Sequence, residues 1–243
     1  MNDNRHDEFA GLTKYGLIKH PESLRDTIVR FIETKIISGD MEAGKRLLPD
    51  ELAGSLNVSK SPVREALLSL QKEGLVTNVP RVGFFVTKIS IEDIEEIYPI
   101  RAALLSLMVK TVIETGFDLK FIRIIDSQIE KMRESVNGSD LKGYHDHNLN
   151  FHNTLLEYCG NTRLRSIISQ LGKQVLRMRM LSLSGPGRMK RSLELNEKLV
   201  QAIKKKDIEA STNLSTIITQ EGLENLRKVL SKNNSTRMSV NGN

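Results

Sequence analysis

Polar side chains at the start of a predicted helix could contact a nucleic acid. They are Lys60, Ser61 and Arg64, with Glu65 next to Arg64. Arginine can donate two hydrogen bonds to O6 and N7 of guanine, whereas lysine and serine are better suited to phosphate oxygens. Because charged residues are also common on ordinary exposed helices, the alternative is a solvated helix start with no ligand.

The neighbouring residues predict two short helices joined by a tight turn, which would present these side chains. One face of the first helix is formed by Leu52, Ala53 and Leu56. Asn57 follows at the turn, where asparagine tolerates a left-handed backbone. Ser59 or Ser61 can cap the second helix, and Gly74 ends it. The second helix has an apolar face at helical spacing, formed by Val63, Ala66, Leu67 and Leu70.

A small hairpin is predicted directly after the second helix. Residues 75–79 and 84–87 are rich in β-branched and aromatic side chains, and residues 80–83 supply the turn between them. Arg81 at the tip of the hairpin could reach a phosphate or the minor groove. Two helices followed by such a hairpin indicate a helix-turn-helix with a two-stranded wing, although a generic hairpin is the alternative.

The segment from Gly39 to Val86 resembles the winged-helix domain of the GntR family of bacterial transcription regulators. The similarity lies in residues 38–44, 51–53, 74–76 and 83–86, and above all in the block Val58-Ser59-Lys60-Ser61-Pro62-Val63-Arg64-Glu65-Ala66-Leu67. The resemblance places Lys60, Ser61 and Arg64 on DNA-contacting positions. The predicted DNA-binding set is Lys60, Ser61, Arg64, Glu65, Arg81 and Gly83.

Two residues depart from the pattern of that family. Lys60 stands where the family usually has arginine, and an ammonium group cannot form the same planar fork of hydrogen bonds. Asp50 stands where many relatives carry an arginine that contacts DNA. These departures weaken the expectation of base readout from the first helix of the pair.

The composition indicates a cytoplasmic chain with room for two domains. Its 243 residues are 39% hydrophobic, and the single cysteine, Cys159, allows no intrachain disulfide. No apolar run reaches the roughly 18 residues that span a membrane, and the polar first residues predict no signal peptide. The net charge of +6 suits a nucleic-acid partner.

The basic residues are unevenly distributed along the chain. Residues 1–88 hold 13 basic and 12 acidic side chains, so the predicted DNA-binding part is nearly neutral. Residues 163–206 hold 12 basic and 2 acidic side chains, a net charge of +10. Solvated helix faces are the simplest interpretation of this second region. An anion-attracting pocket and a secondary DNA contact are the alternatives.

The fold class expected is mainly α with a small β wing. A helix over about residues 22–38 precedes the helix-turn-helix, and helical patterns continue over about 90–116, 118–135, 140–158, 162–183, 188–205 and 207–229. Pro99 should kink or split the first of these, so an antiparallel bundle of six or seven helices is predicted. The predicted parts are a flexible arm (1–20), the winged helix-turn-helix (21–88), the bundle (89–230) and a disordered tail (231–243).

The bundle resembles the FCD effector domain of the FadR-type branch of the same family, over about residues 91–228. The similarity rests on residues 98–101, 148–152, 161–164, 196–203 and Asp207. Many members of that branch hold a divalent metal with one aspartate and three histidines. The corresponding residues here are Asn148, His152, Asn196 and Ile218, of which only His152 is a good ligand. We therefore predict no metal and no other cofactor.

The same region predicts an effector site without metal, built from Arg101, Asn148, His152 and Asn196. By resemblance, effectors of FCD domains are mostly small carboxylates or sugar acids, and one branch takes long-chain acyl-CoA. A buried Arg101 would require an anionic or carbonyl partner. The structural alternative is that His152 is a satisfied core histidine and that Arg101 forms an internal ion pair.

No catalytic motif is present that would indicate an enzyme. The sequence contains no G-x-S-x-G, H-E-x-x-H, P-loop or G-x-G-x-x-G pattern. The function predicted is a ligand-responsive, homodimeric transcription regulator of palindromic operator DNA, acting as a repressor as most of the family does. One alternative is a ligand-binding or enzymatic helical bundle whose winged helix contacts only proteins. A non-specific architectural DNA-binding protein is the other.

Overall fold

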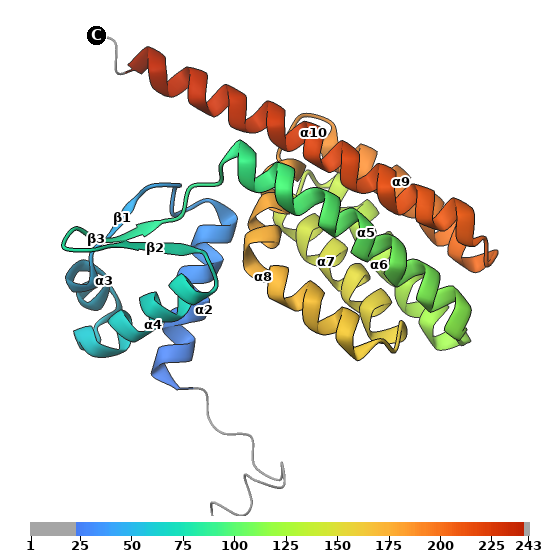
Figure 1. Cartoon of the computed structure of the whole chain (residues 1–243), viewed down its shortest axis with the longest axis horizontal. Helices are drawn as coiled ribbons and strands as arrows, with labels where there is room; N and C mark the ends of the chain where they lie inside the picture. Colours follow the sequence, from blue (N-terminus) through green and yellow to red (C-terminus); the bar gives the residue numbers. More distant parts are fainter. Residues whose placement is uncertain (1–22, 241–243) are drawn as a thin grey trace, which may run out of the picture.

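A computed structural model describes residues 23–240, and the chain forms two lobes (Figure 1). The predicted arm at residues 1–20 and the last three residues lie outside this range. The N-terminal lobe holds three helices and a small sheet. Its elements are α2 (Leu24–Ser38), β1 (Arg46–Leu47), α3 (Pro49–Leu56), α4 (Lys60–Lys72), β2 (Val76–Val79) and β3 (Gly83–Val86).

The wing is a three-stranded antiparallel sheet in the order β1-β3-β2, so the prediction of two strands was wrong. The missed strand is β1, in which Arg46 pairs with Phe85 and Leu47 with Phe84. A strand of two residues is too short to show an alternating pattern in the sequence. Only its pairing with β3 defines it as a strand. The side chain of Leu47 is buried and fixes β1 to the core of the lobe.

The helix-turn-helix forms as predicted, but without the predicted side-chain cap. Asn57 adopts the left-handed conformation (φ 53°, ψ 47°) and turns the chain between α3 and α4. Ser59 occupies the N-cap position of α4 without a capping hydrogen bond from its side chain. Ser61 instead donates to Oε1 of Glu65 at 3.2 Å. The core of this lobe orients α4, because its apolar face packs on α2 through Val63, Ala66, Leu67 and Leu70.

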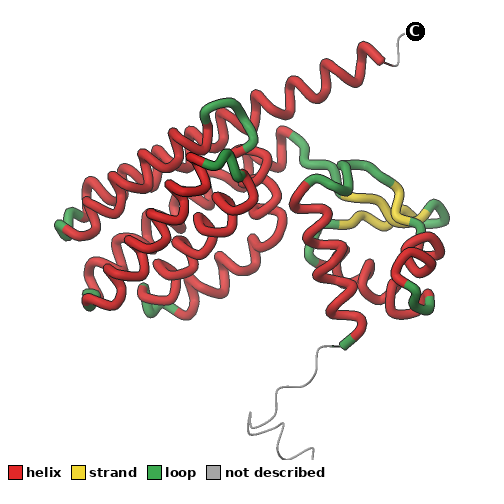
Figure 2. The backbone as a smooth tube through the Cα atoms, turned by 180° about the vertical axis from the view of Figure 1, so that it is seen from behind, coloured by secondary structure: helices red, strands yellow, loops and turns green. Residues whose placement is uncertain are grey.

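The C-terminal lobe is a bundle of six helices within the described range. They are α5 (Ile91–Thr115), α6 (Leu119–Asn137), α7 (Leu141–Tyr158), α8 (Thr162–Leu183), α9 (Arg188–Lys204) and α10 (Ile208–Val240). Figure 2 shows them side by side, apart from the sheet-bearing lobe. No helix in residues 23–240 is long and apolar enough to cross a membrane.

At Pro99 the structure excludes the split and agrees with the six-helix alternative, whereas the predicted end of the last helix differs from the structure. Helix α5 continues through Pro99 as one helix, so the chain is not split there. Buried side chains on both sides of the proline, including Ile94 and Leu105, hold the helix in place despite the lost hydrogen bond. Helix α10 extends to Val240, where a disordered tail was predicted from residue 231. Extending an existing helix fixes one residue for each hydrogen bond gained, which makes such continuation easy.

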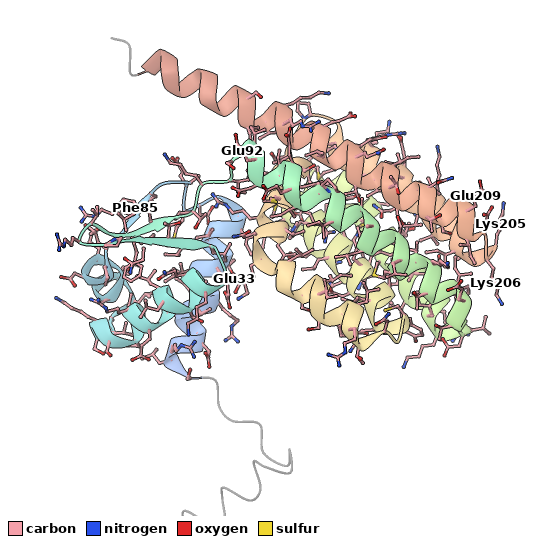
Figure 3. All side chains as sticks on the ribbon, in the orientation of Figure 1. Glu33, Phe85, Glu92, Lys205, Lys206 and Glu209 are labelled. Carbon is pink, nitrogen blue, oxygen red and sulfur yellow. The ribbon has the colours of Figure 1, made fainter. Side chains whose placement is uncertain are left out.

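Helix α8 joins the two lobes. Its residue Gly172 has φ 35° and ψ −131°, a break inside the helix that the sequence pattern did not reveal. Directly after the break, Nζ of Lys173 lies 2.6 Å from Glu33 of α2 and 2.9 Å from Glu73 at the end of α4. Figure 3 shows Glu33 on the side of the N-terminal lobe that faces the bundle.

Two further side chains of α8 bond the backbone of the N-terminal lobe. Gln174 donates to the carbonyl oxygen of Gly74 at 3.3 Å, and Arg177 donates to that of Thr87. We name these contacts of Lys173, Gln174 and Arg177 the α8 joint. The joint ties the bundle to the residues that follow α4 and β3.

We predict that Gly172→Ala destabilises the protein, because a side chain is strained at this positive φ although nothing lies within 4 Å of the new Cβ. A loss of about 1–3 kcal/mol in the free energy of unfolding is expected. Urea unfolding measures it. The matched control is Gly54→Ala in α3, where the added Cβ also meets nothing and the backbone is helical. That variant should gain about 0.5–1 kcal/mol. Equal effects of the two substitutions would contradict the break at Gly172.

Candidate functional site

The start of α4 presents the predicted polar residues to solvent. Lys60, Ser61 and Arg64 are exposed, and they line one side of a surface groove of about 560 Å³. The opposite side of the groove comes from the start of α3, including Asp50 and Glu51. Figure 1 shows this end of α4 and the β2–β3 turn far from the bundle. The site is therefore open to a large partner.

The charges in this groove are not equivalent. Nζ of Lys60 lies 2.9 Å from Oδ2 of Asp50, and both side chains are about two-thirds exposed, at 70% and 68%. Ser61 is bonded to Glu65. Arg64 forms no ion pair with any side chain described in the structure, so its guanidinium is available to an incoming ligand. Among these residues, Arg64 is the best candidate for contact with a base edge.

The wing adds two exposed arginines beside the turn. Arg81 lies in the turn with φ 64°, and Gly83 begins β3 with φ 125°. Arg46, which the sequence analysis did not select, donates from Nη2 to the carbonyl oxygen of Val82 at 2.5 Å. This bond supports the turn from β1. Its detection required the pairing of β1 with β3, which the sequence did not reveal.

A small cavity of about 30 Å³ lies inside the bundle and has an unusual concentration of positive charge. It is lined by residues from α5, α7, α8, α9 and α10, among them Tyr98, Arg101, Asn148, His152, Arg179 and Arg188. Three of the four predicted effector residues therefore meet here. The fourth, Asn196, is fully buried and donates to the carbonyl oxygen of Ser192 at 2.7 Å, and Ser192 is a wall residue.

Arg101 and Arg179 are the dominant charges of this cavity. Each is only 8% exposed, and neither forms an ion pair with a described carboxylate. Arg101 lies over the ring of Tyr98, 5.6 Å from its centroid, and Arg179 donates to Oδ1 of Asn148. Burial, and after it the positive charge of Arg101, lower the pKa of Arg179 to about 9. Burial lowers the pKa of Arg101 as well.

Arg188 differs because it has a counter-charge. Its Nη1 lies 3.2 Å from Oε2 of Glu221. The burial of arginines is the main feature that the sequence pattern does not reveal. For the basic run at 163–206, an anion-attracting pocket is one of the alternatives, and solvated helix faces are the simplest interpretation. That interpretation is wrong for Arg177, Arg179 and Arg188, which are all buried. Arginine and methionine alternate over residues 177–180, which places the two arginines on different sides of α8. This alternation is a sequence signal that at least one of them faces the interior.

His152 is a neutral side chain with an unused nitrogen. Burial, then Arg179, then Arg101 hold the pKa of His152 well below its ordinary value of 6.5. Its Nδ1 atom is buried and has no hydrogen-bond partner among the described residues. Neither structural alternative describes this geometry, because His152 is not fully satisfied and no ion pair neutralises Arg101.

A larger cavity of about 320 Å³ adjoins the small one. Arg101, His152 and Arg179 line both, so these three side chains form the boundary between them. The rest of its wall is mostly apolar and is contributed by α5, α7 and α8. Glu33 and Lys173 of the α8 joint also line it. The cavity therefore extends from the buried charges to the contact between the lobes.

The small cavity does not suit a divalent metal. Ile218 lines it with a side chain that cannot be a ligand, and the guanidinium of Arg179 binds Asn148, the residue that would coordinate through oxygen. A cation placed there would lie next to that positive charge. Within residues 23–240, no group of three or more histidine, cysteine, aspartate or glutamate side chains could hold a metal ion.

Both parts of the chain match known protein families. Residues 24–86 match the model of bacterial regulatory proteins of the gntR family, and residues 96–220 match the FCD domain. The HTH-type transcriptional regulator YdhC of Bacillus subtilis, described as uncharacterized, is 30% identical over 200 residues, which are 82% of this chain and 89% of that protein. The gluconate operon transcriptional repressor of the same species is 28% identical over 72% of this chain and 74% of that protein.

Solved structures show the same fold. McbR/YncC of E. coli superposes with a TM-score of 0.73 at 23% identity, covering 86% of this chain and 99% of that one. A GntR regulator from Rhodococcus sp. RHA1, titled a putative transcriptional regulator, has a TM-score of 0.72 at 20% identity, with coverages of 85% and 99%. At these identities the likeness supports the arrangement of elements alone.

We predict that the stability of the protein falls as the pH drops below about 6.5, because His152 is uncharged when folded and gains a proton when unfolded. For such a histidine, the free energy of unfolding falls by up to about 1.4 kcal/mol for each pH unit below the pKa of the unfolded chain. The fall ends where the pH reaches the pKa of the folded state. Urea unfolding between about pH 7.5 and 5 measures this slope. His152→Gln should make the slope shallower, and an unchanged slope would contradict the assignment.

Proposed function

Because this chain belongs to the gntR family of bacterial regulatory proteins, we propose that it is a homodimeric repressor whose operator affinity is set by an anionic effector. Members of the family are transcription regulators, and the FCD domain is their effector-binding part. The observation that carries the effector proposal is the pair of buried guanidiniums, Arg101 and Arg179, which lack a counter-charge among the described residues. The proposed action requires binding only, with no catalytic step.

The proposed DNA contacts divide into two kinds. Arg64 reads a base edge in the major groove, since it is exposed and unpaired among the described side chains. Ser61 and the wing residues Arg81 and Gly83 contact the phosphate backbone, through side chains or backbone N–H groups. Lys60 is in place for a further phosphate contact, but its ion pair with Asp50 competes with that contact. Glu65 orients Ser61 through their hydrogen bond. Arg46 supports the wing turn and adds a further positive charge beside it.

Dimerisation follows from how little DNA one such lobe can read. A single recognition helix contacts only a few base pairs, and two copies related by a two-fold axis double the contacts and fix the spacing of the half-sites. We propose that the two copies bind a palindromic operator in the cytoplasm. Repression is the mode named for the gluconate operon repressor, and we propose the same sign of regulation here.

Coupling between the effector and DNA runs through α8. Arg179 of α8 lines the effector site, and Lys173 of the same helix pairs with Glu73 at the end of α4. A ligand that moves this part of α8 changes the position of α4 relative to the bundle. The two α4 helices of a dimer then no longer fit both half-sites, and operator affinity falls.

The first test is Arg64→Ala, which should weaken binding to the operator by about 1–3 kcal/mol and leave binding to scrambled DNA nearly unchanged. Fluorescence anisotropy with fragments from the DNA flanking the gene, over a salt series, measures both affinities. Arg123→Ala, an exposed arginine on α6, is the control and should bind as the parent does. Equal losses on operator and scrambled DNA would contradict base readout by Arg64. No binding to any DNA would contradict the proposed function.

The second test is Asp50→Asn, which should strengthen binding to both operator and scrambled DNA. The substitution removes a negative charge from the groove and releases Lys60 from its ion pair, so one more phosphate contact becomes available. The slope of log affinity against log salt should steepen by about one unit. Glu114→Gln breaks a similarly exposed ion pair with Lys110 in the bundle and should change neither quantity. Weaker binding of Asp50→Asn would show that the carboxylate itself contacts the DNA.

A further inference from the structure

The two adjoining cavities of the bundle have opposite chemical character. At the small one, a ligand would meet Arg101 and Arg179, the amide of Asn148 and the free nitrogen of His152. At the large one it would meet a mainly apolar wall, which includes Leu105, Met108, Leu149, Leu156, Ile168 and Val175. One molecule that fills both spaces must be charged at one end and apolar along its body.

The charged end fits a single carboxylate. A space of about 30 Å³ has the size of one small group, and guanidinium groups match the paired oxygens of a carboxylate in their geometry. The imidazole of His152 is neutral because burial lowers its pKa, so it offers hydrogen bonding and adds no charge. A second negative group would find no further unpaired cation here, since Arg188 is already paired with Glu221.

The apolar wall of the large cavity disfavours a polyhydroxy acid as the ligand. Hydroxyl groups placed against the leucine and isoleucine side chains of the large cavity would lose their hydrogen bonds with water and gain few in return. An alkyl or aromatic body binds more favourably there, because it loses no hydrogen bonds with water when it is buried. The volume of about 320 Å³ is within the range of small-molecule pockets.

The charge of Arg179 stands in place of a metal ion. Its guanidinium binds Oδ1 of Asn148, so the positive charge that would attract an anion comes from the chain itself. Such a site does not need to be loaded with a cation before the ligand binds.

From these contacts we infer that the effector is an amphipathic monocarboxylate, held at its carboxylate by Arg101 and Arg179 without a metal ion. Its apolar body fills the large cavity and reaches the wall that carries Glu33 and Lys173. This inference rests on the proposed function and narrows its effector to one chemical class. It also places the far end of the ligand against the α8 joint, where occupancy acts on the contact between the lobes.

The test uses the full chain after treatment with EDTA. Butanoate, hexanoate and octanoate are titrated by calorimetry and by thermal shift, with gluconate and 1-octanol as probes that lack one of the two features. We expect octanoate to bind and to raise the melting temperature. Each added methylene should strengthen binding by about fourfold until the cavity is filled, because it buries further apolar surface. Gluconate and 1-octanol should bind at least about tenfold more weakly than octanoate.

Two variants test the charges. Arg179→Gln and Arg101→Gln should each weaken octanoate binding by about tenfold or more, whereas Arg123→Gln on the surface should leave it unchanged. Circular dichroism establishes that each variant is folded, and the methylene series on the unaltered protein tests the apolar part if a variant does not fold.

Several outcomes would overturn the inference: tighter binding of gluconate than octanoate, no binding of any probe, an unchanged affinity in Arg179→Gln, or carboxylate binding that requires added zinc, nickel or manganese. Operator binding, measured on the same samples without probe, separates this from the proposed function. Intact operator binding with no octanoate response overturns the effector class alone, whereas absent DNA binding overturns the proposed function.

Discussion

Two buried guanidiniums without a counter-charge among residues 23–240 are the constraint on which the proposed function of the bundle depends. Taking a charged side chain out of water costs several kcal/mol unless a partner compensates for the loss. Among the described residues, the partner of Arg101 is the face of the Tyr98 ring, and the partner of Arg179 is the amide oxygen of Asn148. The lowered pKa of about 9 for Arg179 still leaves it charged at neutral pH. The interior of the bundle is therefore positively charged, and an anion that binds there removes a cost that the folded chain otherwise bears.

The same helix that carries one of these charges also holds the N-terminal lobe. Gly172 interrupts α8 between its first half, which packs in the bundle, and the stretch with Lys173, Gln174 and Arg177. These three contact α2, the end of α4 and the residue after β3. Arg179 lies two residues after Arg177 on the same helix. Under the proposed function, the break at Gly172 lets this segment move without disrupting the rest of the bundle, so a ligand at Arg179 biases the α8 joint.

The sequence predicts those features of the fold that depend on neighbouring residues alone. The turn at Asn57, the exposed start of α4 and most helix bounds follow from the spacing of apolar side chains and from turn residues. Asn148 and His152, which are spaced i, i+4 on one helix face, came instead from the resemblance to FCD domains. Arg179 was missed because a basic residue on a helix has the same local pattern whether solvent or a cavity faces it. The break at Gly172 and the strand β1 depend on contacts with distant segments, which no local pattern records.

The modest charge of the N-terminal lobe makes its proposed affinity for an operator sensitive to where α4 is placed. Residues 1–88 carry a net charge of only +1, and Lys60 is already paired with Asp50, so general attraction to phosphate is weak. In the proposed dimer, affinity for the operator must then come from a few placed contacts such as that of Arg64, made once by each copy. A protein that binds DNA mainly through its overall positive charge would tolerate a small rotation of α4, since phosphates lie everywhere along the duplex. A protein held by a few base contacts loses them when the spacing of its two helices changes. Under the proposed function, the weak charge of this lobe therefore makes a small movement at the α8 joint sufficient to release the operator.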